Sequence, residues 1–96
     1  MKLSGKQIKH LRGQAHHRQV VVSIGNNGLS DAVLAELEQA LDTHELLKIK
    51  LPTGSRGEKK RLMDTLCDKT GATAVQLIGR VAVLFRPLED SGISLP

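Results

Sequence analysis

Residues 73–86 read TAVQLIGRVAVLFR, and this stretch decides what kind of sheet the chain can form. Two runs rich in branched apolar residues flank Gly79-Arg80, and a two-residue connection that begins with Gly is typical of a type II′ β-hairpin. Residues 81–86 are apolar on both faces of the expected second strand. A strand that is apolar on both faces belongs in the middle of a sheet. We therefore expect an antiparallel hairpin whose second strand, 81–86, is central.

The segments that precede this hairpin alternate between helical and extended patterns. Apolar residues at helical spacing predict three helices, over residues 4–16, 31–43 and 58–70. β-branched or alternating runs predict two strands, over residues 19–24 and 46–51. Ser4 and Ser30 are suitable N-caps, and Gly71 is placed to be a left-handed C-terminal cap. The order αβαβαββ implies right-handed parallel crossovers before the hairpin. It predicts a two-layer α/β (α+β) fold with a four-stranded mixed sheet.

Length and composition indicate one globular domain. The chain has 96 residues, 40% of them hydrophobic and 25% charged, which suits a single core spanning 1–96. Residues 87–96 carry no pattern, so we expect a mobile tail there. No apolar run is long enough to cross a bilayer, and the basic start has no apolar h-region of a secretory signal. With Cys67 as its single cysteine, the chain suits a reducing compartment, and we expect a cytoplasmic monomer with no membrane partner.

Charge is segregated along the sequence. The net charge is +4, and residues 1–20 hold five basic residues and no acidic one. Residues 29–47 hold five acidic residues and no basic one. Such a division orients a polyanion toward one side of a protein, although any single basic run is also explained as a solvated face. Because Phe85 is the only aromatic residue, the chain cannot build a multi-ring platform for stacking single-stranded bases.

A glycine-basic quartet, Gly54-Ser55-Arg56-Gly57, joins the strand 46–51 to the helix 58–70. Glycines at both ends let a backbone approach a phosphate and adopt conformations that side chains forbid. The helix after it directs N–H groups and a positive dipole end at the same anion. The alternative is a plain turn and helix start. Basic residues on both sides favour phosphate binding, and the GxxxxGK[ST] spacing of a P-loop is absent.

The chain resembles the CRM domain family (chloroplast RNA splicing and ribosome maturation), in its free-standing bacterial YhbY form. The resemblance lies in five stretches in order: LRGQAH at 11–16, VSIGNNGLS at 22–30, LLKIKL at 46–51, TGSRGEKK at 53–60 and LIGRVAVLFR at 77–86. It implies a fold similar to the C-terminal domain of translation initiation factor 3, with strand order 1-2-4-3. It also implies RNA binding through the GxxG segment and association with precursors of the large ribosomal subunit.

From these patterns we expect an RNA-binding protein, with ribosomal RNA as its partner and with no cofactor. The expected RNA-binding residues are Gly54, Ser55, Arg56, Gly57, Lys59, Lys60, Lys48, Lys50, Lys6, Lys9 and Arg12. Two rival functions stay open. One is an enzyme that holds a nucleotide or phosphate ester in the same segment, for which only Glu58 lies near enough to act as a base. The other is a protein-interaction module that uses the acidic second helix.

Three further features of the sequence have structural explanations that we prefer. Gly25-Asn26-Asn27-Gly28 is a second strand-to-helix turn, but an acidic helix follows it, so turn chemistry suffices. His10, His16 and His17 have no acidic or cysteine neighbour in their segment, and we expect no metal site. Cys67 lies on the apolar stripe of its helix and is expected to pack there. We expect no catalytic residue.

Overall fold

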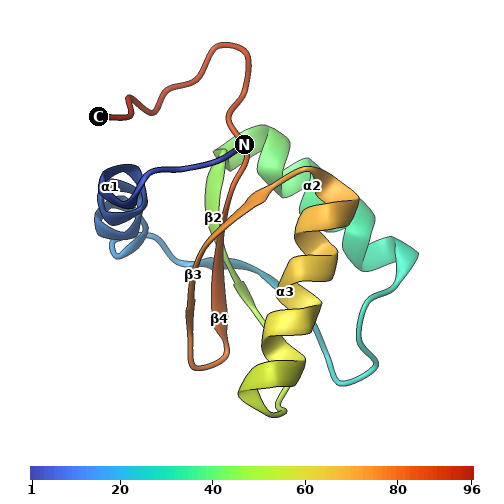
Figure 1. The fold of residues 1–96 in the computed structure, drawn as a ribbon. Coiled ribbons are helices and arrows are strands. Elements are labelled where there is room, and N and C mark those ends of the chain that lie inside the picture. The colour runs from blue at the N-terminus through green and yellow to red at the C-terminus, as the bar shows by residue number, and fades with distance from the viewer.

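The computed structural model describes all 96 residues and contains three helices and one four-stranded sheet (Figure 1). In chain order the elements are α1 (Gly5–Ala15), β1 (Val20–Ser23), α2 (Asp31–His44), β2 (Leu46–Lys50), α3 (Arg56–Thr70), β3 (Thr73–Ile78) and β4 (Val81–Phe85). The predicted order αβαβαββ is confirmed. Five of the seven elements begin and end within one residue of the predicted bounds, and β3 has the bounds predicted for it. The exception is the start of α3, described below.

The sheet order is β1-β2-β4-β3, as the family resemblance implied. β1 and β2 are parallel, whereas β4 pairs antiparallel with β2 on one side and with β3 on the other. The second strand of the hairpin is therefore central, as its two apolar faces predicted. Gly79 has φ +56, while Arg80 keeps a negative φ, as a type II′ turn requires. β3 runs in the direction of β2 with β4 inserted between them, so both crossovers connect strands that run in parallel.

Alternate residues of the strands supply two separate apolar clusters, one on each face of the sheet. On one face, α2 and α3 cover Leu47, Ile49 and Leu84 within a cluster of 12 buried residues. On the other face, α1 covers Leu46 and Phe85 within a cluster of six. The sheet forms one of the two predicted layers, and α2 and α3 form the other. The helix α1 adds a partial layer on the opposite face of the sheet (Figure 1).

Local signals define the helix ends. Ser4 and Ser30 cap α1 and α2, and Gly71 ends α3 in the left-handed conformation with φ +75, as the sequence predicted. The predicted start of α3 at residue 58 is wrong, because Ser55 is the N-cap and the helix begins at Arg56. The polar residues 56–58 have no apolar periodicity, so the pattern missed the first turn.

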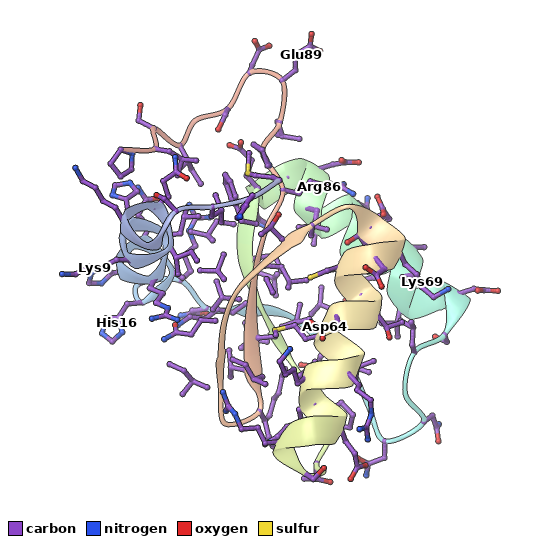
Figure 2. The ribbon with its side chains drawn as sticks, in the orientation of Figure 1. Lys9, His16, Asp64, Lys69, Arg86 and Glu89 are labelled. Carbon is purple, nitrogen blue, oxygen red and sulfur yellow. The ribbon has the colours of Figure 1, made fainter.

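Polar contacts hold the ends of the elements together. Arg86, directly after β4, donates to the carboxylates of Glu38 at 2.7 Å and Asp42 at 2.8 Å and to the Thr70 carbonyl at 2.8 Å. It thereby joins α2 to the end of α3 (Figure 2). None of the three helices has both the length and the apolar character that a membrane crossing requires.

Residues 87–96 form no helix or strand, but they do contact the domain. The backbone N–H groups of Leu88 and Gly92 donate to the Glu45 carboxylate, each at 2.9 Å, and Ile93 packs on the α1 side of the sheet. Glu45 is 7% exposed and has φ +58, the only positive φ outside glycine. Such a conformation costs about 1–3 kcal/mol, so its surroundings must hold it in place. How mobile this tail is in solution stays a prediction.

Candidate nucleic-acid interface

The GxxG segment is the start of a capped helix. Ser55 Oγ accepts from the Glu58 N–H at 3.1 Å, and Glu58 Oε1 accepts from the Ser55 N–H at 3.3 Å. This reciprocal capping box leaves the backbone N–H groups of Arg56 and Gly57 without any hydrogen-bond partner in the protein. Both residues are exposed. Two free N–H donors at the positive end of a 15-residue helix are a ready site for an anion.

Neither glycine of the quartet needs to be glycine for the fold of this chain. The expectation that they adopt conformations forbidden to side chains is wrong, because neither has a positive φ. A Cβ at Gly57 would meet nothing closer than 3.9 Å, and one at Gly54 would meet the Glu58 side chain at an ordinary 3.4 Å. The remaining reason for glycine at these positions is that a phosphate can approach the backbone closely where no side chain stands.

The basic residues of the first α3 turns point to two sides. Lys59 lines a small recess together with Gly54 and Glu58. Arg56 and Lys60 line a different recess beside β3, and Arg56 reaches the Leu77 carbonyl there at 3.4 Å, a long and weak hydrogen bond. Lys60 also pairs with Asp64 at 3.3 Å, but both side chains are well exposed, and such pairs contribute little.

Arg12 brings α1 to this second recess. Although it lies 44 positions earlier than Arg56 in the sequence, both side chains line the recess beside β3, together with Gln76. α1 and α3 both contact β3, an edge strand of the sheet, so the two helices border this edge from opposite faces. The Arg12 side chain is exposed and makes no ion pair or hydrogen bond.

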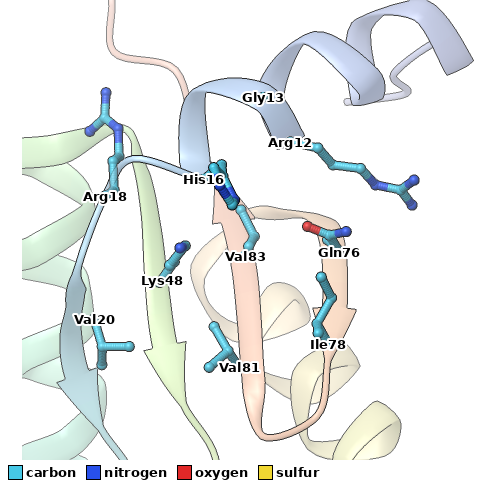
Figure 3. A pocket seen from close by; sticks show the side chains of 10 residues that line it. All are labelled: Arg12, Gly13, His16, Arg18, Val20, Lys48, Gln76, Ile78, Val81 and Val83. Atoms are coloured by element: carbon cyan, nitrogen blue, oxygen red, sulfur yellow. The ribbon is translucent and has the colours of Figure 1, made fainter.

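The two lysines of β2 lie on the same face of the sheet as α1. Lys48 is opposite Val83 and Lys50 is opposite Val81 in the β2–β4 register, on the face that α1 only partly covers. Lys48 lines a pocket there with Arg12 (Figure 3). The acidic helix α2 packs on the opposite face. The basic α1 and the two β2 lysines therefore lie on the opposite face from the acidic α2, whereas the basic start of α3 lies on the same face as α2.

Lys6 and Lys9 lie apart from the GxxG segment. They line a shallow recess on the outer side of α1, and Figure 2 shows Lys9 projecting away from the sheet. Gly13 borders both this recess and the pocket that contains Lys48, so the two are neighbours. Most of the predicted basic residues thus fall into one band that runs from the outer side of α1, past Arg12, to the start of α3. This holds for Lys6, Lys9, Arg12, Arg56 and Lys60, with Lys48 and Lys50 on the sheet beside them, whereas Lys59 and Gly54 line a separate recess.

The sequence did not single out the other residues of the central pocket. They include Val20, Gln76, Ile78 and Val81, which were assigned to strands without a solvent-facing role. Lys48 and Lys50 alternate with Leu47 and Ile49 along β2, and this pattern is the sequence signal that one face of the sheet is partly open to solvent. Arg18 also borders the pocket, but its guanidinium donates to the Leu46 carbonyl at 3.0 Å and serves the fold.

The groups considered for catalysis or metal binding have internal roles or lack partners. The hydrogen bond from the Ser55 N–H holds the pKa of Glu58 below its ordinary value of 4.5, so this carboxylate is a weak base as well as a helix cap. Burial, together with Asp64 and Asp68, raises the pKa of the Cys67 thiol to about 11, which makes it unreactive near neutral pH. No group of three His, Cys, Asp or Glu side chains is placed to hold a metal ion.

Comparison with known proteins agrees with this architecture. Residues 3–86 match the CRS1 / YhbY (CRM) domain. The chain is 46% identical over 94 residues to a Haemophilus influenzae protein named "RNA-binding protein", covering 98% of this chain and 95% of that one. It is 30% identical over 95 residues to the Bacillus subtilis "Probable RNA-binding protein YqeI", covering 98% and 99%.

A solved structure has the same fold along its whole length. The solution structure of a Staphylococcus aureus protein superposes with a TM-score of 0.87 at 32% identity, covering 99% of this chain and all of that one. The family match includes every helix and strand described above, from α1 through β4. The chain belongs to the CRS1/YhbY (CRM) domain family.

Proposed function

We propose that this chain binds RNA by its phosphate backbone and acts in the assembly of the large ribosomal subunit, without catalysing a reaction. Its relatives are named as RNA-binding proteins, which supports the general activity. The ribosomal role rests on the resemblance described above. In this proposal the protein works as a cytoplasmic monomer, with RNA as its partner.

The observation that carries the proposal is the position of Arg12 between two basic groups. It lines one recess with Arg56 and Lys60 of α3 and another with Lys48 of β2. No acidic residue lines either recess. Four cations from three elements, next to two free backbone N–H groups, form a surface for consecutive phosphates rather than for a single anion.

The two rival functions find less support. A phosphate-ester enzyme needs a base near the GxxG segment, and Glu58 is occupied in the capping box. A protein-binding role for α2 would use its acidic residues, but Glu38 and Asp42 already pair with Arg86. Asp31 and Glu36 remain exposed on that helix, which is too little charge for a strong acidic patch.

RNA affinity as a function of salt tests the binding mode. If about five phosphates are neutralised, the slope of log affinity against log salt is expected near −3.5 to −4.5. Arg12→Gln should weaken binding and reduce the slope by roughly one phosphate's worth. Lys69→Gln is the matched control, because Lys69 is an exposed, unpaired cation at the far end of α3 (Figure 2). A flat salt response, or equal losses in the two variants, would contradict the proposed surface.

The ribosomal role needs a measurement in cells. We expect ultraviolet crosslinking followed by sequencing to recover precursor RNA of the large subunit, and sucrose gradients to place the protein with particles smaller than the mature ribosome. Arg12→Gln should leave those fractions and Lys69→Gln should stay in them. Recovery of unrelated messenger RNA, with no enrichment of ribosomal precursors, would retain RNA binding and reject the assembly role.

A further inference from the structure

One half of a sheet face is left open beside α1. Because α1 covers Leu46 and Phe85 at one end of that face, the other end carries a pocket of about 530 Å³ (Figure 3). This volume lies in the range of roughly 300–1,000 Å³ that is usual for small-ligand sites. The backbone-binding surface proposed above uses two cations that line this pocket, Arg12 and Lys48, but it leaves the aliphatic part of the lining without a role.

The floor of the pocket is aliphatic. Val81 of β4 and Ile78 of β3 are opposite each other in the hairpin register and form an adjacent pair, while Val20 of β1 lines the pocket on the far side of Lys48. Ile78 is 60% exposed and Val20 is 38% exposed, which makes them two of the four large hydrophobic residues that the protein leaves in solvent. Exposed aliphatic side chains that line a pocket mark a surface that a partner covers.

The rim of the pocket is polar and basic. Arg12 and Gln76 border it from the β3 side and Lys48 stands on β2, and none of these three side chains makes a hydrogen bond or ion pair within the protein (Figure 3). No acidic residue is among the ten that line the pocket. The pocket therefore suits a flat, largely apolar group that carries hydrogen-bonding edges and is attached to negative charge.

We propose that this pocket receives the base of one unpaired nucleotide in the bound RNA. The base would lie on Ile78 and Val81, its polar edge would face Gln76 and Lys48, and a flanking phosphate would lie at Arg12. This inference rests on the proposed RNA binding and deepens it, because it assigns a site that reads single-stranded positions. An aliphatic floor takes the place of the aromatic rings that the chain lacks.

Continuity with the basic surface selects a nucleotide over a protein segment. Arg12 and Gln76 line both this pocket and the recess that contains Arg56 and Lys60, so the pocket borders the proposed path of the RNA backbone. An RNA held there by its phosphates brings its own bases to the pocket, and a bulged or looped base is free to leave the helix and enter it. An apolar protein segment would leave Arg12 and Lys48 without anionic partners.

The test compares two RNA hairpins that are identical except for one bulged nucleotide. We expect the protein to bind the bulged hairpin at least about fivefold more tightly than the perfect one. This ratio is the lower end of the discrimination that a good polar contact to a base provides. The variant Ile78→Ser/Val81→Thr should bring that ratio close to one and leave affinity for the perfect hairpin, and its salt slope, unchanged, because neither side chain lines the recess that contains Arg56 and Lys60. Val21→Ser is the matched control, because Val21 is 40% exposed on β1 outside the pocket.

Methyl NMR of the unaltered protein provides a second readout that does not depend on the folding of a variant. The bulged hairpin should shift the methyl resonances of Ile78 and Val81 through the ring current of the base, and the perfect hairpin should not. Absence of these shifts overturns the inference, and so does a bulge preference that survives in the double variant.

The outcomes separate the pocket from the proposed function. If both hairpins bind equally and with a steep salt dependence, RNA binding stands and the base site is rejected, which leaves an apolar protein segment as the occupant to examine. If neither hairpin binds and ribosomal RNA does not bind either, the proposed function itself fails, and the base site fails with it.

Discussion

Replacing Gly57 by alanine should change stability and RNA binding in opposite directions. Gly57 is the second residue of α3, its φ is negative, and the nearest atoms to an added Cβ are 3.9 Å away. The fold therefore accepts alanine without strain. Its backbone N–H has no partner in the protein and is one of the two donors that we assign to a phosphate. The added methyl group stands beside the place where that phosphate must approach.

The two expected magnitudes come from separate causes. Alanine at a compatible glycine position stabilises a protein by about 0.4–1 kcal/mol, because the unfolded chain loses freedom. For a domain of this size that raises Tm by roughly 2–8 °C. Loss of one charge-assisted hydrogen bond to a phosphate costs about 1.5–3 kcal/mol, which corresponds to a roughly 10- to 150-fold weaker Kd.

The assay measures thermal unfolding and RNA affinity on the same protein samples. Gly25→Ala is the matched control, because Gly25 begins the other strand-to-helix turn, has a negative φ, and has nothing within 4 Å of an added Cβ. It should raise Tm by a similar amount and leave Kd unchanged, because the acidic helix α2 follows that turn.

One combination of Tm and RNA affinity would refute the phosphate contact at the Gly57 N–H. If Gly57→Ala raises Tm and binds RNA like the parent, the GxxG segment is only a helix start. Gly54→Asp/Gly57→Asp, which adds two negative charges at the same place, would then also retain binding. The contact would move to α1, where Lys6, Lys9 and Arg12 would become the main candidates.

Three further predictions concern single charged groups. Arg56→Ala should weaken RNA binding by about 1.5–3 kcal/mol with little change in Tm, because the side chain is exposed and its contact with the protein is weak; titrations of RNA with both proteins measure this. Glu36→Lys should leave RNA affinity unchanged or raise it, and a loss of affinity in a folded Glu36→Lys protein would mean that the binding face is misplaced. Glu38→Lys should lower Tm, because Glu38 is a 2.7 Å partner of the largely buried Arg86. Burial alone would raise the pKa of Glu45, but hydrogen bonds from the tail hold this pKa below the ordinary 4.5 in the folded protein. The contact between Glu45 and the tail therefore stabilises the protein above pH 4.5. This stabilisation is lost as the pH falls through the lowered pKa of the folded state. Amide exchange at Gly92 between pH 6 and strongly acidic conditions measures this release, and an exchange profile that shows no acid-induced opening would refute it.

Short-range patterns predicted most of the architecture. The 3.6-residue and two-residue periodicities, the serine caps and Gly71 are properties of neighbouring residues, so they were visible without a structure. The start of α3 was missed for the same reason, since Arg56 and Gly57 carry no apolar signal. Their helical conformation depends on the capping box between Ser55 and Glu58.

Side-chain contacts between segments that are distant in sequence could not be predicted from these short-range patterns. The sequence separates Arg12 from Arg56 by two strands and one helix, and they line one recess only because α1 and α3 both border the edge strand β3. The acidic residues of α2 looked like an interaction surface, yet Glu38 and Asp42 pair with Arg86, which is distant in sequence.

The sequence by itself determined the order of the elements, the central place of residues 81–86 and the separation of basic from acidic segments, because these depend on the local spacing of apolar and charged residues. Only the tertiary structure decided which face of the sheet stays open. That outcome depends on how much of the sheet the 11-residue α1 covers, and on strand pairings that place Lys48, Val81 and Ile78 on one surface. Pairings between distant strands leave no mark in the local pattern, so the basic pocket became visible only when the chain was folded.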